Sequence, residues 1–416
     1  MVDANARLFS SLFGISTAEN VVLGTEGWLY YAGTLADYQN KVPLRERQAR
    51  NIAHNLRMLQ DWCSAQGADF VFTVAPDKNS LYGSDMPYYY PQVANDDMEM
   101  LEAWLDAYKV RYVDMHSVLT EAGGVQYFLR DSHWSDRGAL LGHDAIADAL
   151  SLKTAGIDPA DLIEHKDYVG DLNRMLYPVS AIPEADWYAE GVNDGSGETG
   201  TMRSGAFWDY VEGADPNDGI VATEPTEANP YASVAASNGT MLMFRDSFAI
   251  GLLPFFACET ESARFDKMVP YNGLQLLDEA YDSVVVERAQ RHVADLADEA
   301  FIMPYPAVDA SAGEVIDAAG ASATCDVQVE GSLISVSGCV QGIALQPDDD
   351  VLVRISDKEG LARTYEAFAC TGDGSDNGYE LYVGSDQWLG KAVKLEVLVR
   401  SDYSSLRVAA YDLIIS

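Results

Sequence analysis

The sequence predicts an α/β fold, in which helices cover both faces of a parallel β-sheet, followed by an all-β domain. Buried, strand-like segments alternate with helical patterns along the first three quarters of the chain, which is the order that a parallel sheet requires. The last quarter instead holds short alternating segments separated by turn residues. With 416 residues, of which 48 % are hydrophobic, the chain is long enough for two or three domains with a sizeable core.

Helical periodicity is clearest in residues 44–66, an Arg- and Gln-rich segment in which apolar residues recur every three or four positions. Gly67 follows it in the position that commonly ends a helix. Further helices are expected at 96–108 and 136–150, the second of which begins with Asp136 as a capping residue. The buried strands expected between and after these helices are 68–76, 110–115, 240–248 and 282–288.

We expect three regions along the chain: a first domain at 1–305, a linker at 306–323 and a β-sandwich-like domain at 324–416. The linker is assigned because its residues are small, polar and rich in Gly and Ala. The first domain carries an insertion at about 181–235, which holds eleven acidic residues and one basic residue. Such a segment is typical of a solvated surface insertion, and a lid or substrate-contacting lobe is the alternative.

The net charge of −38 and the isoelectric point near 4.2 restrict the partners of this protein. Such a chain repels the phosphate backbone of nucleic acids and the anionic headgroups of lipids, so neither is expected as a partner. No window reaches 18 uninterrupted apolar residues, so no transmembrane helix is expected. The first residues also lack the basic and apolar regions of a signal peptide, a start that fits a chain whose membrane anchor has been removed.

The cysteine pattern and the acidic loops predict no metal site. The five cysteines show no C-x-x-C spacing, which argues against a zinc site or a thioredoxin-type motif. Three of them fall in the last quarter, which leaves room for one disulfide with unassigned partners. Residues 373–378 imitate the first half of an EF-hand loop, but Gly384 stands where that loop needs a bidentate glutamate. We therefore expect a polar hairpin turn there.

The residue types of nucleophilic serine catalysis occur in two short segments, 131–134 and 245–248. Ser247 stands where a predicted strand runs into a helix, so its hydroxyl can project from the sheet edge and its backbone N–H can stabilise an oxyanion. Asp131 and His133 are two residues apart, and side chains at this spacing point to the same side of an extended chain. The carboxylate can then orient the imidazole and leave Nε2 for Ser247. Taken separately, the two segments are an ordinary helix cap and a surface hydrogen bond.

Further polar residues follow the predicted strands at the same sheet edge. Lys78 and Asn79 come after the first buried strand, and they are candidates for supporting a substrate or an oxyanion. The alternative for Lys78 is a loop lysine paired with Asp77. Glu287 and Arg288 end the last strand of the sheet, where a structural salt bridge is expected rather than a site that binds carboxylates.

Six segments resemble successive blocks of the DHHW and alginate O-acetyltransferase-like family, which is related in fold to the SGNH hydrolases. In chain order they read GTEGWLYY, VAPDKNSLYGSDMP, RDSHWSDRGA, YVGDLNRML, MLMFRDSF and VVVERAQRHV. They span about residues 20–300, and D-x-H-W followed by D-S-F is the most specific pair. The resemblance implies a flavodoxin-like SGNH hydrolase-type domain that moves acetyl groups on or off sugar hydroxyls of an exported or cell-wall polysaccharide. It also implies an extracytoplasmic location, with a membrane anchor.

Carried over to this sequence, the resemblance makes Ser247 the nucleophile, His133 the general base and Asp131 the residue that orients the base. An acetyl-serine would pass its acetyl group to a sugar hydroxyl, or to water in an esterase. No cofactor is implied, because a membrane-bound partner protein or a small molecule would supply the acetyl group. Arg245 stands where the family has glycine, so its side chain would crowd the acyl site or bring a guanidinium to it. Trp134 is a further candidate for substrate contact, with packing beneath the His133 loop as the alternative.

A non-catalytic protein that binds glycans, or that serves as a scaffold in polysaccharide export, is the alternative function. The departure at Arg245, the acidic insertion and the all-β tail motivate this alternative. The tail would then be a carbohydrate-binding module whose tyrosines and tryptophan form a sugar-stacking face. The competing explanation places these aromatic residues in the core of the tail.

Overall fold

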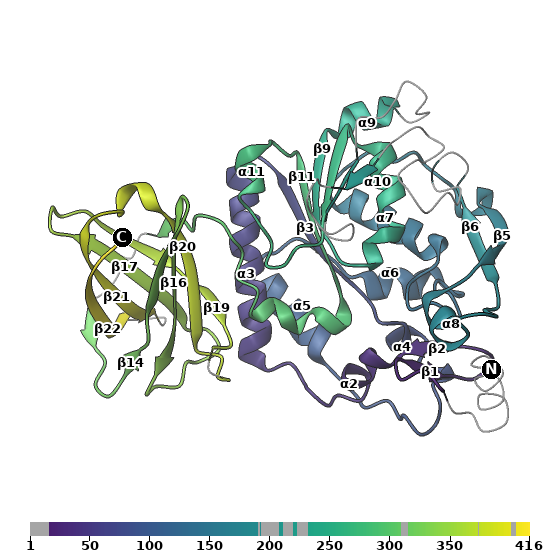
Figure 1. Cartoon of the computed structure of the whole chain (residues 1–416), viewed down its shortest axis with the longest axis horizontal. Coiled ribbons are helices and arrows are strands. Elements are labelled where there is room, and N and C mark those ends of the chain that lie inside the picture. The colour runs from purple at the N-terminus through teal and green to yellow at the C-terminus, as the bar shows by residue number, and fades with distance from the viewer. Residues whose placement is uncertain are drawn as a thin grey trace.

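The computed structural model describes residues 16–189, 192, 208–210, 219–222, 232–308, 315–372, 374–400 and 405–416. Figure 1 shows a larger part, in which helices surround a central sheet, beside a smaller part built from the C-terminal strands. The predicted fold class is confirmed, because a parallel sheet with helices on both faces is followed by a domain of mostly antiparallel strands.

The central sheet has seven strands in the order β4-β3-β11-β9-β10-β8-β7. Their bounds are β3 Asp69–Ala75, β4 Tyr112–Val113, β7 Trp208–Tyr210, β8 Gly219–Ala222, β9 Thr240–Phe244, β10 Ser262–Asp266 and β11 Ser283–Ala289. The first five strands in this order are parallel, β8 pairs with β10 in the antiparallel direction, and β7 pairs with β8 in the antiparallel direction. The sheet therefore contains every predicted strand and β10, which was not expected. Strands β7 and β8 belong to the insertion at 181–235, most of which lies outside the described residues.

Helices cover both faces of this sheet because successive residues of a buried strand point to opposite faces. The main ones are α3 Glu46–Ala65, α5 Asp97–Tyr108, α6 Met115–Ala122, α7 Asp136–Ala149 and α10 Leu253–Glu259. Phe70 and Phe72 of β3 pack in the same buried cluster as Leu56 of α3. Val71, between them, packs in a second cluster with Leu140 of α7. No helix in the described ranges is long and apolar enough to cross a membrane.

Two small antiparallel pairs lie outside the central sheet. They are β1 Val21–Leu23 with β2 Leu29–Tyr31, and β5 Ile163–Tyr168 with β6 Glu184–Tyr188. Helix α8 (Asp171–Leu176) packs on the first pair through the buried side chains of Leu172 and Leu176. The backbone N–H of Leu29 donates to the carbonyl of Leu129 over 2.8 Å. The first pair therefore supports the loop that leads to Asp131.

The C-terminal strands form two sheets, in the orders β12-β18-β17-β21-β22-β13 and β14-β16-β20-β19, and β15 pairs with β16. Their bounds are β12 Ala307–Val308, β13 Val315–Asp317, β14 Ser322–Ala323, β15 Asp326–Glu330, β16 Leu333–Gln341, β17 Asp350–Asp357, β18 Ala362–Glu366, β19 Phe368–Cys370, β20 Gly378–Gly384, β21 Ala392–Arg400 and β22 Ser405–Ile414. The described residues of the predicted linker at 306–323 include β12, β13 and β14, which pair with these sheets. The domain bounds 1–305 and 324–416 stay a prediction.

The aromatic residues of the tail lie largely in its core. Trp388 and Tyr379 are fully buried, and the indole of Trp388 donates to the Tyr365 hydroxyl at 3.2 Å. These three side chains therefore do not form an exposed sugar-stacking face. The five cysteines are free thiols, so the disulfide considered for the last quarter does not form.

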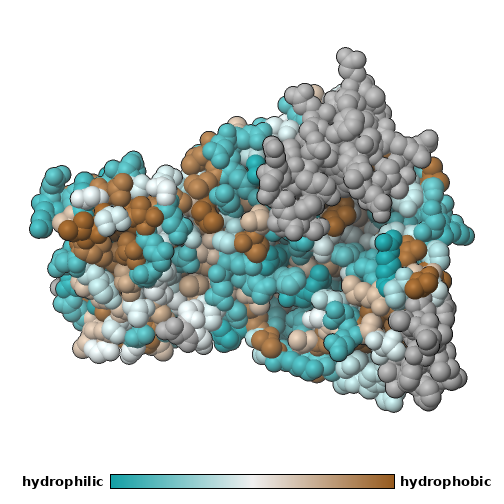
Figure 2. Space-filling model, in the orientation of Figure 1, coloured by the Kyte–Doolittle hydropathy of each residue, from teal (hydrophilic) through white to brown (hydrophobic). Residues whose placement is uncertain are grey.

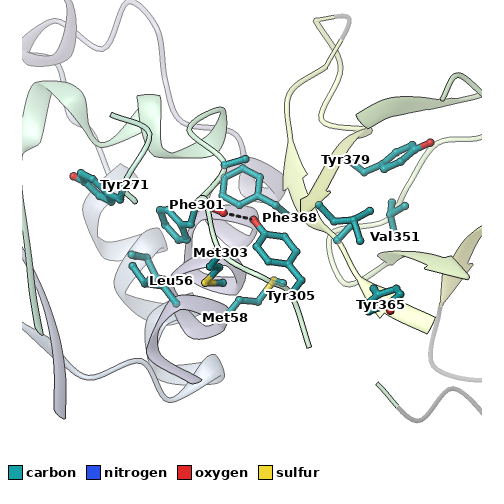
Figure 3. Close-up of a cluster of buried hydrophobic side chains, with 14 of the residues drawn as sticks. Leu56, Met58, Tyr271, Phe301, Met303, Tyr305, Val351, Tyr365, Phe368 and Tyr379 are labelled. Carbon is teal, nitrogen blue, oxygen red and sulfur yellow. Dashed lines mark hydrogen bonds between the residues drawn. The ribbon is translucent and has the colours of Figure 1, made fainter. Parts of the chain in front are cut away.

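One hydrophobic cluster runs from α3 into the C-terminal sheets (Figure 3). Phe301 and Tyr305, which follow β11 in the chain, lie between the two parts (Figure 3). The ring of Phe301 packs edge-on against Phe368 of β19, with centroids 5.5 Å apart. The Tyr305 hydroxyl donates to the Phe301 carbonyl over 3.1 Å. The two parts thus share a continuous core instead of being joined by a free segment.

Buried charges complete the junction between α3 and the tail. The guanidinium of Arg50, which is 1 % exposed, pairs with Asp350 of β17. His54 Nε2 lies 2.8 Å from Glu366 of β18. The side chain of Asn55 exchanges two hydrogen bonds with the backbone of Ala369, at 2.8 and 3.0 Å. Such directional contacts fix one orientation of the tail on the helix.

Candidate active site

The structure brings Ser247, His133 and Asp131 together in one hydrogen-bonded relay of side chains. Ser247 follows β9 and begins the short helix η4 (Phe248–Gly251). His133 Nε2 lies 2.9 Å from Ser247 Oγ, and His133 Nδ1 lies 2.7 Å from Asp131 Oδ1. Because an ionised carboxylate can only accept, Nδ1 carries the proton and Nε2 accepts from the Ser247 hydroxyl. This is the arrangement in which an imidazole can act as a general base toward a serine.

The carboxylate of Asp131 is buried and fully occupied. Besides His133 Nδ1, it accepts from the His133 backbone N–H (3.0 Å), the Tyr168 hydroxyl (2.8 Å) and the Asp171 backbone N–H (2.7 Å). Burial by itself would raise the pKa of Asp131, but the hydrogen bonds and charge of His133 and the Asp171 N–H outweigh it and hold the pKa well below its usual range. Asp131 therefore stays charged and fixed beside the imidazole.

Gly170 and Asp171, which belong to the YVGDLNRML block, pack against the Asp131 end of the relay. A Cβ at Gly170 would collide with the Arg130 carbonyl and come within 2.8 Å of the Asp131 Cβ, so only glycine permits this approach. Asp171 accepts from the Ser132 backbone N–H (2.8 Å) and the Ser132 hydroxyl (2.5 Å). Burial and the charge of Asp131 raise the pKa of Asp171. The pair thus clamps the loop that carries His133.

Lys78 anchors the same loop from inside the protein, which differs from its predicted contact with substrate. Its ammonium group is buried and donates to the carbonyls of Phe128 (3.0 Å), Leu129 (3.1 Å) and Asp131 (2.7 Å). Burial lowers the pKa of Lys78 from 10.5 to about 7. Its alternative partner, Asp77, pairs instead with Arg291 at 3.1 Å. Lys78 is therefore a positioning residue for the loop.

Replacing Lys78 with methionine is expected to lower the free energy of unfolding by about 1–3 kcal/mol, because three buried carbonyls lose their donor. Urea unfolding of the wild type and Lys78→Met measures this difference. Lys358→Met, at an exposed lysine of the tail, is the matched control and should change stability by less than about 0.5 kcal/mol. Equal stabilities of Lys78→Met and the control would show that Lys78 does not anchor the loop.

Three other predicted site residues, Asn79, Trp134 and Arg245, are buried and form hydrogen bonds with other parts of the protein. The side chain of Asn79 donates to the Thr34 hydroxyl at 2.9 Å. The indole of Trp134 donates to the Phe248 carbonyl at 3.0 Å and is buried, so it packs beneath the site. The guanidinium of Arg245 is buried and donates to the Asp246 carbonyl at 3.2 Å. The expected effect of Arg245 on the acyl site stays a prediction.

Glu287 and Arg288 do not pair with each other, as the expected salt bridge would require. Arg288 pairs with Glu299 at 2.8 Å, whereas Glu287 accepts from the backbone N–H of Asp246 at 3.0 Å. Burial and the charge of Asp246 raise the pKa of Glu287 well above its usual value. The side chain of Asp246 accepts from the backbone N–H of Phe248 (2.8 Å), one residue beyond Ser247. Glu287 and Asp246 thus fix the turn that presents the serine.

Ser247 and His133 open into a cavity of about 340 Å³. The described residues that line it are Tyr31, Gly33, Ser132, His133, Asp171, Met175, Ser247, Arg291 and His292. Sequence reasoning missed Arg291, whose guanidinium lies 5.3 Å from the ring centroid of Phe248 and 5.6 Å from that of Tyr31. The sequence feature that could have identified Arg291 is its place in the VVVERAQRHV block, two residues after the end of β11. Arg291 places a positive charge beside the serine.

The donor atoms around His133 do not suit a metal ion. Ligand atoms of Asp131, His133 and Asp171 lie within 4.8 Å of one another, which is close enough to share an ion. Both carboxylate oxygens of Asp131 and both ring nitrogens of His133, however, are already engaged in hydrogen bonds within the relay. Binding an ion would break the contacts that align the serine.

Residues 21–193 match the family model described as SGNH hydrolase-like domain, acetyltransferase AlgX. Similar solved structures include PatB1 of Bacillus cereus (16 % identity, 66 % of this chain and 96 % of that chain, TM-score 0.47) and the O-acetyltransferase domain of Pseudomonas putida AlgJ (17 %, 66 % and 92 %, 0.41). A DHHW family protein from Eubacterium siraeum is also similar (14 %, 59 % and 86 %, 0.42). No protein of curated function matches significantly. The resemblance to the DHHW and alginate O-acetyltransferase-like family, with its SGNH hydrolase-like domain, is confirmed.

Proposed function

We propose that the protein is a serine-dependent O-acetyltransferase that modifies hydroxyls of an exported or cell-wall polysaccharide through an acetyl-serine intermediate. The observation that carries this proposal is the relay from Asp131 to His133 and Ser247, with contacts of 2.7 and 2.9 Å, at the wall of a cavity. The acetyltransferase description of the matching family model supports the choice of acyl group. The cavity of about 340 Å³ has room for an acetyl group and part of its donor or acceptor.

The first half of the reaction builds the acetyl-enzyme. His133 Nε2 takes the proton of Ser247 while Oγ attacks the carbonyl carbon of the acetyl donor. The backbone N–H of Ser247 and the guanidinium of Arg291 stabilise the negative charge that develops on the carbonyl oxygen. Collapse of this intermediate breaks the bond to the leaving group, which receives the proton from His133. Asp131 stabilises the imidazolium throughout.

The second half returns the serine. A sugar hydroxyl enters the cavity, His133 Nε2 takes its proton, and its oxygen attacks the acetyl-serine carbonyl. The bond from the carbonyl carbon to Ser247 Oγ then breaks, and Oγ recovers a proton from His133. Attack by water instead would make the protein an esterase. We propose an extracytoplasmic site of action and a membrane-bound protein or small molecule as the acetyl donor, because the resemblance implies both.

The departure at Arg245, one of the three motives for the non-catalytic alternative, leaves the contacts of Asp131, His133 and Ser247 in place. That alternative rested partly on Arg245, whose side chain is buried and bonded to the Asp246 carbonyl. The position of the guanidinium leaves the relay intact. A serine-reactive phosphonate should therefore label Ser247, and binding of an oligosaccharide without any labelling would favour the scaffold function.

Trapping of the acetyl-enzyme tests the proposal directly. Rapid acid quenching after mixing with a chromogenic acetyl ester should leave one acetyl group, a mass increase of one acetyl, on the peptide that contains Ser247. The Ser247→Ala variant should carry none, and Ser335→Ala, in β16 of the tail, should be labelled like the wild type. Acetyl groups on a different residue, with ester turnover unchanged in Ser247→Ala, would contradict the proposal.

A further inference from the structure

A second and larger cavity, of about 690 Å³, adjoins the cavity of Ser247. Gly33 and Arg291 line both cavities, so the two cavities lie next to each other. The second cavity is bounded by the carboxyl ends of β3 and β4, through residues 72–76 and 112–113. Ligands of open α/β sheets bind at this edge. Figure 2 shows that the visible face of the larger part is hollowed and that mainly hydrophilic residues surround the hollow.

The walls of this cavity offer acceptors of hydrogen bonds and negative charge. Its acidic lining residues are Asp37, Asp97, Glu99, Glu102 and Asp114. None of these five carboxylates forms an ion pair with a basic side chain in the described parts of the chain. The two arginines of the lining pair with other acids, since Arg45 pairs with Asp376 at 2.6 Å and Arg291 with Asp77 at 3.1 Å, and His116 also lines the cavity. The five carboxylates therefore have no basic partner of their own among the described residues.

Two further observations indicate that a ligand completes this cavity. Asn79 lines it and is 2 % exposed, and its amide nitrogen donates to Thr34, but its side-chain oxygen accepts from no described residue. This oxygen is not among the fully buried atoms that lack a partner, so it faces the cavity, where a donor group of a ligand or water can reach it. Burial, together with the charges of Asp114 and Glu99, raises the pKa of Glu102 to about 7. A positively charged group among these carboxylates would relieve the repulsion.

Aromatic side chains add a surface against which a ring can pack. Tyr112 of β4 is partly exposed and lines the cavity together with the carboxylates, whereas Tyr38 and Phe72, which also line it, are largely buried. A sugar has both features that such a cavity selects, namely an apolar ring face and several hydroxyl donors. A uronic acid is disfavoured, because its carboxylate would face these acids in a chain of net charge −38.

We propose that the second cavity binds the acetyl acceptor, and that this acceptor is a sugar unit bearing a free amine. The proposal rests on the acetyl-serine function proposed above. The ammonium group of the sugar lies against Glu99, Glu102 and Asp114, while a hydroxyl of the same chain of sugars reaches past Gly33 to Ser247. Because the amine is held as an ammonium ion, it carries no lone pair and is not acetylated. The hydroxyl oxygen forms the new ester bond, the bond to Ser247 Oγ breaks, and the hydroxyl proton passes through His133 to Oγ.

Binding to the catalytically silent Ser247→Ala protein tests this inference without acetyl transfer. Calorimetric titration should show that a glucosamine tetramer binds, whereas the N-acetylated tetramer binds at least about tenfold more weakly and an oligouronate does not bind. Adding Glu99→Gln and Glu102→Gln should weaken binding of the glucosamine tetramer about tenfold or more. Glu121→Gln, at an exposed glutamate of α6 outside the lining, should leave the affinity unchanged.

The outcomes separate this inference from the proposed function. Equal affinity for the two tetramers, or no effect of the paired glutamate substitutions, overturns the inference, while acetylation of Ser247 by the chromogenic ester would still stand. In the wild type, the glucosamine tetramer should also divert the acetyl group from water to sugar, seen as O-acetylated tetramer by mass spectrometry. Absence of O-acetylated product despite an acetylated Ser247 would likewise overturn the assignment of the acceptor.

Discussion

Replacing Ser247 with alanine is expected to lower kcat/KM for a chromogenic acetyl ester by about 10⁴-fold or more. The substitution removes the only oxygen within hydrogen-bond reach of His133 Nε2 among the described residues, 2.9 Å away, so no nucleophile remains for the base. The side chain caps no helix through a hydrogen bond, so the free energy of unfolding should change by less than about 0.5 kcal/mol. Initial rates of ester hydrolysis and urea unfolding measure the two quantities.

Ser132 offers the sharpest comparison, because its hydroxyl also lies near His133, at 3.2 Å from Nδ1. Ser132 is on the wrong side of the ring, since Nδ1 is engaged with Asp131 and its hydroxyl donates to Asp171. Ser132→Ala should lose less than about tenfold in kcat/KM, through a looser loop. A large loss of activity in Ser132→Ala together with near-normal activity in Ser247→Ala would show that Ser132, and not Ser247, is the nucleophile.

The parts of the site that the sequence predicted are those set by local geometry. Asp131 and His133 are two residues apart on an extended segment, so their meeting follows from the alternation of side chains along the backbone. Ser247 stands at the end of a run of buried apolar residues, and the carboxyl ends of parallel strands share one edge of the sheet. Both inferences need only the chain within a few residues of the site.

The residues that the sequence did not predict act across long separations. Tyr168 and Asp171 reach Asp131 from about 40 positions away, and Arg291 enters the cavity from the segment that follows β11. Lys78 follows a strand at the sheet edge where the site was expected, but its ammonium group is buried and donates to three backbone carbonyls. The strands in the predicted linker were missed because two or three residues are too few for a periodic pattern.

Replacing Asp131 with asparagine is expected to lower kcat/KM by about 10³–10⁴-fold while the protein stays folded. An amide can donate to Nδ1, so it favours the tautomer whose proton sits on Nε2, and it no longer stabilises the imidazolium. Tyr168→Phe removes only one of the hydrogen bonds to this carboxylate, so it should lose far less activity. These variants separate the charge and acceptor character of Asp131 from its packing.

The effect of Asp131→Asn on the free energy of unfolding should depend on pH. The direction of this dependence follows from the pKa of Asp131 in the folded protein, which lies well below its usual range. In the folded protein the carboxylate stays ionised at pH values where the unfolded chain has taken up a proton. Its stabilising contribution is therefore complete above the ordinary aspartate pKa of about 4 and is lost as the pH falls below it. The difference in the free energy of unfolding between wild type and Asp131→Asn should shrink below about pH 4, as urea unfolding at several pH values would reveal.

A high residual activity in Asp131→Asn would point to Asp171, whose carboxylate lies 4.0 Å from His133 Nδ1. Burial and the charge of Asp131 raise the pKa of Asp171, so loss of that charge would leave Asp171 the more readily ionised carboxylate beside the imidazole. In that case Asp171→Asn should be mild alone and severe when added to Asp131→Asn. If the double variant is no worse than Asp131→Asn, Asp131 alone orients the base and Asp171 serves only to hold Ser132.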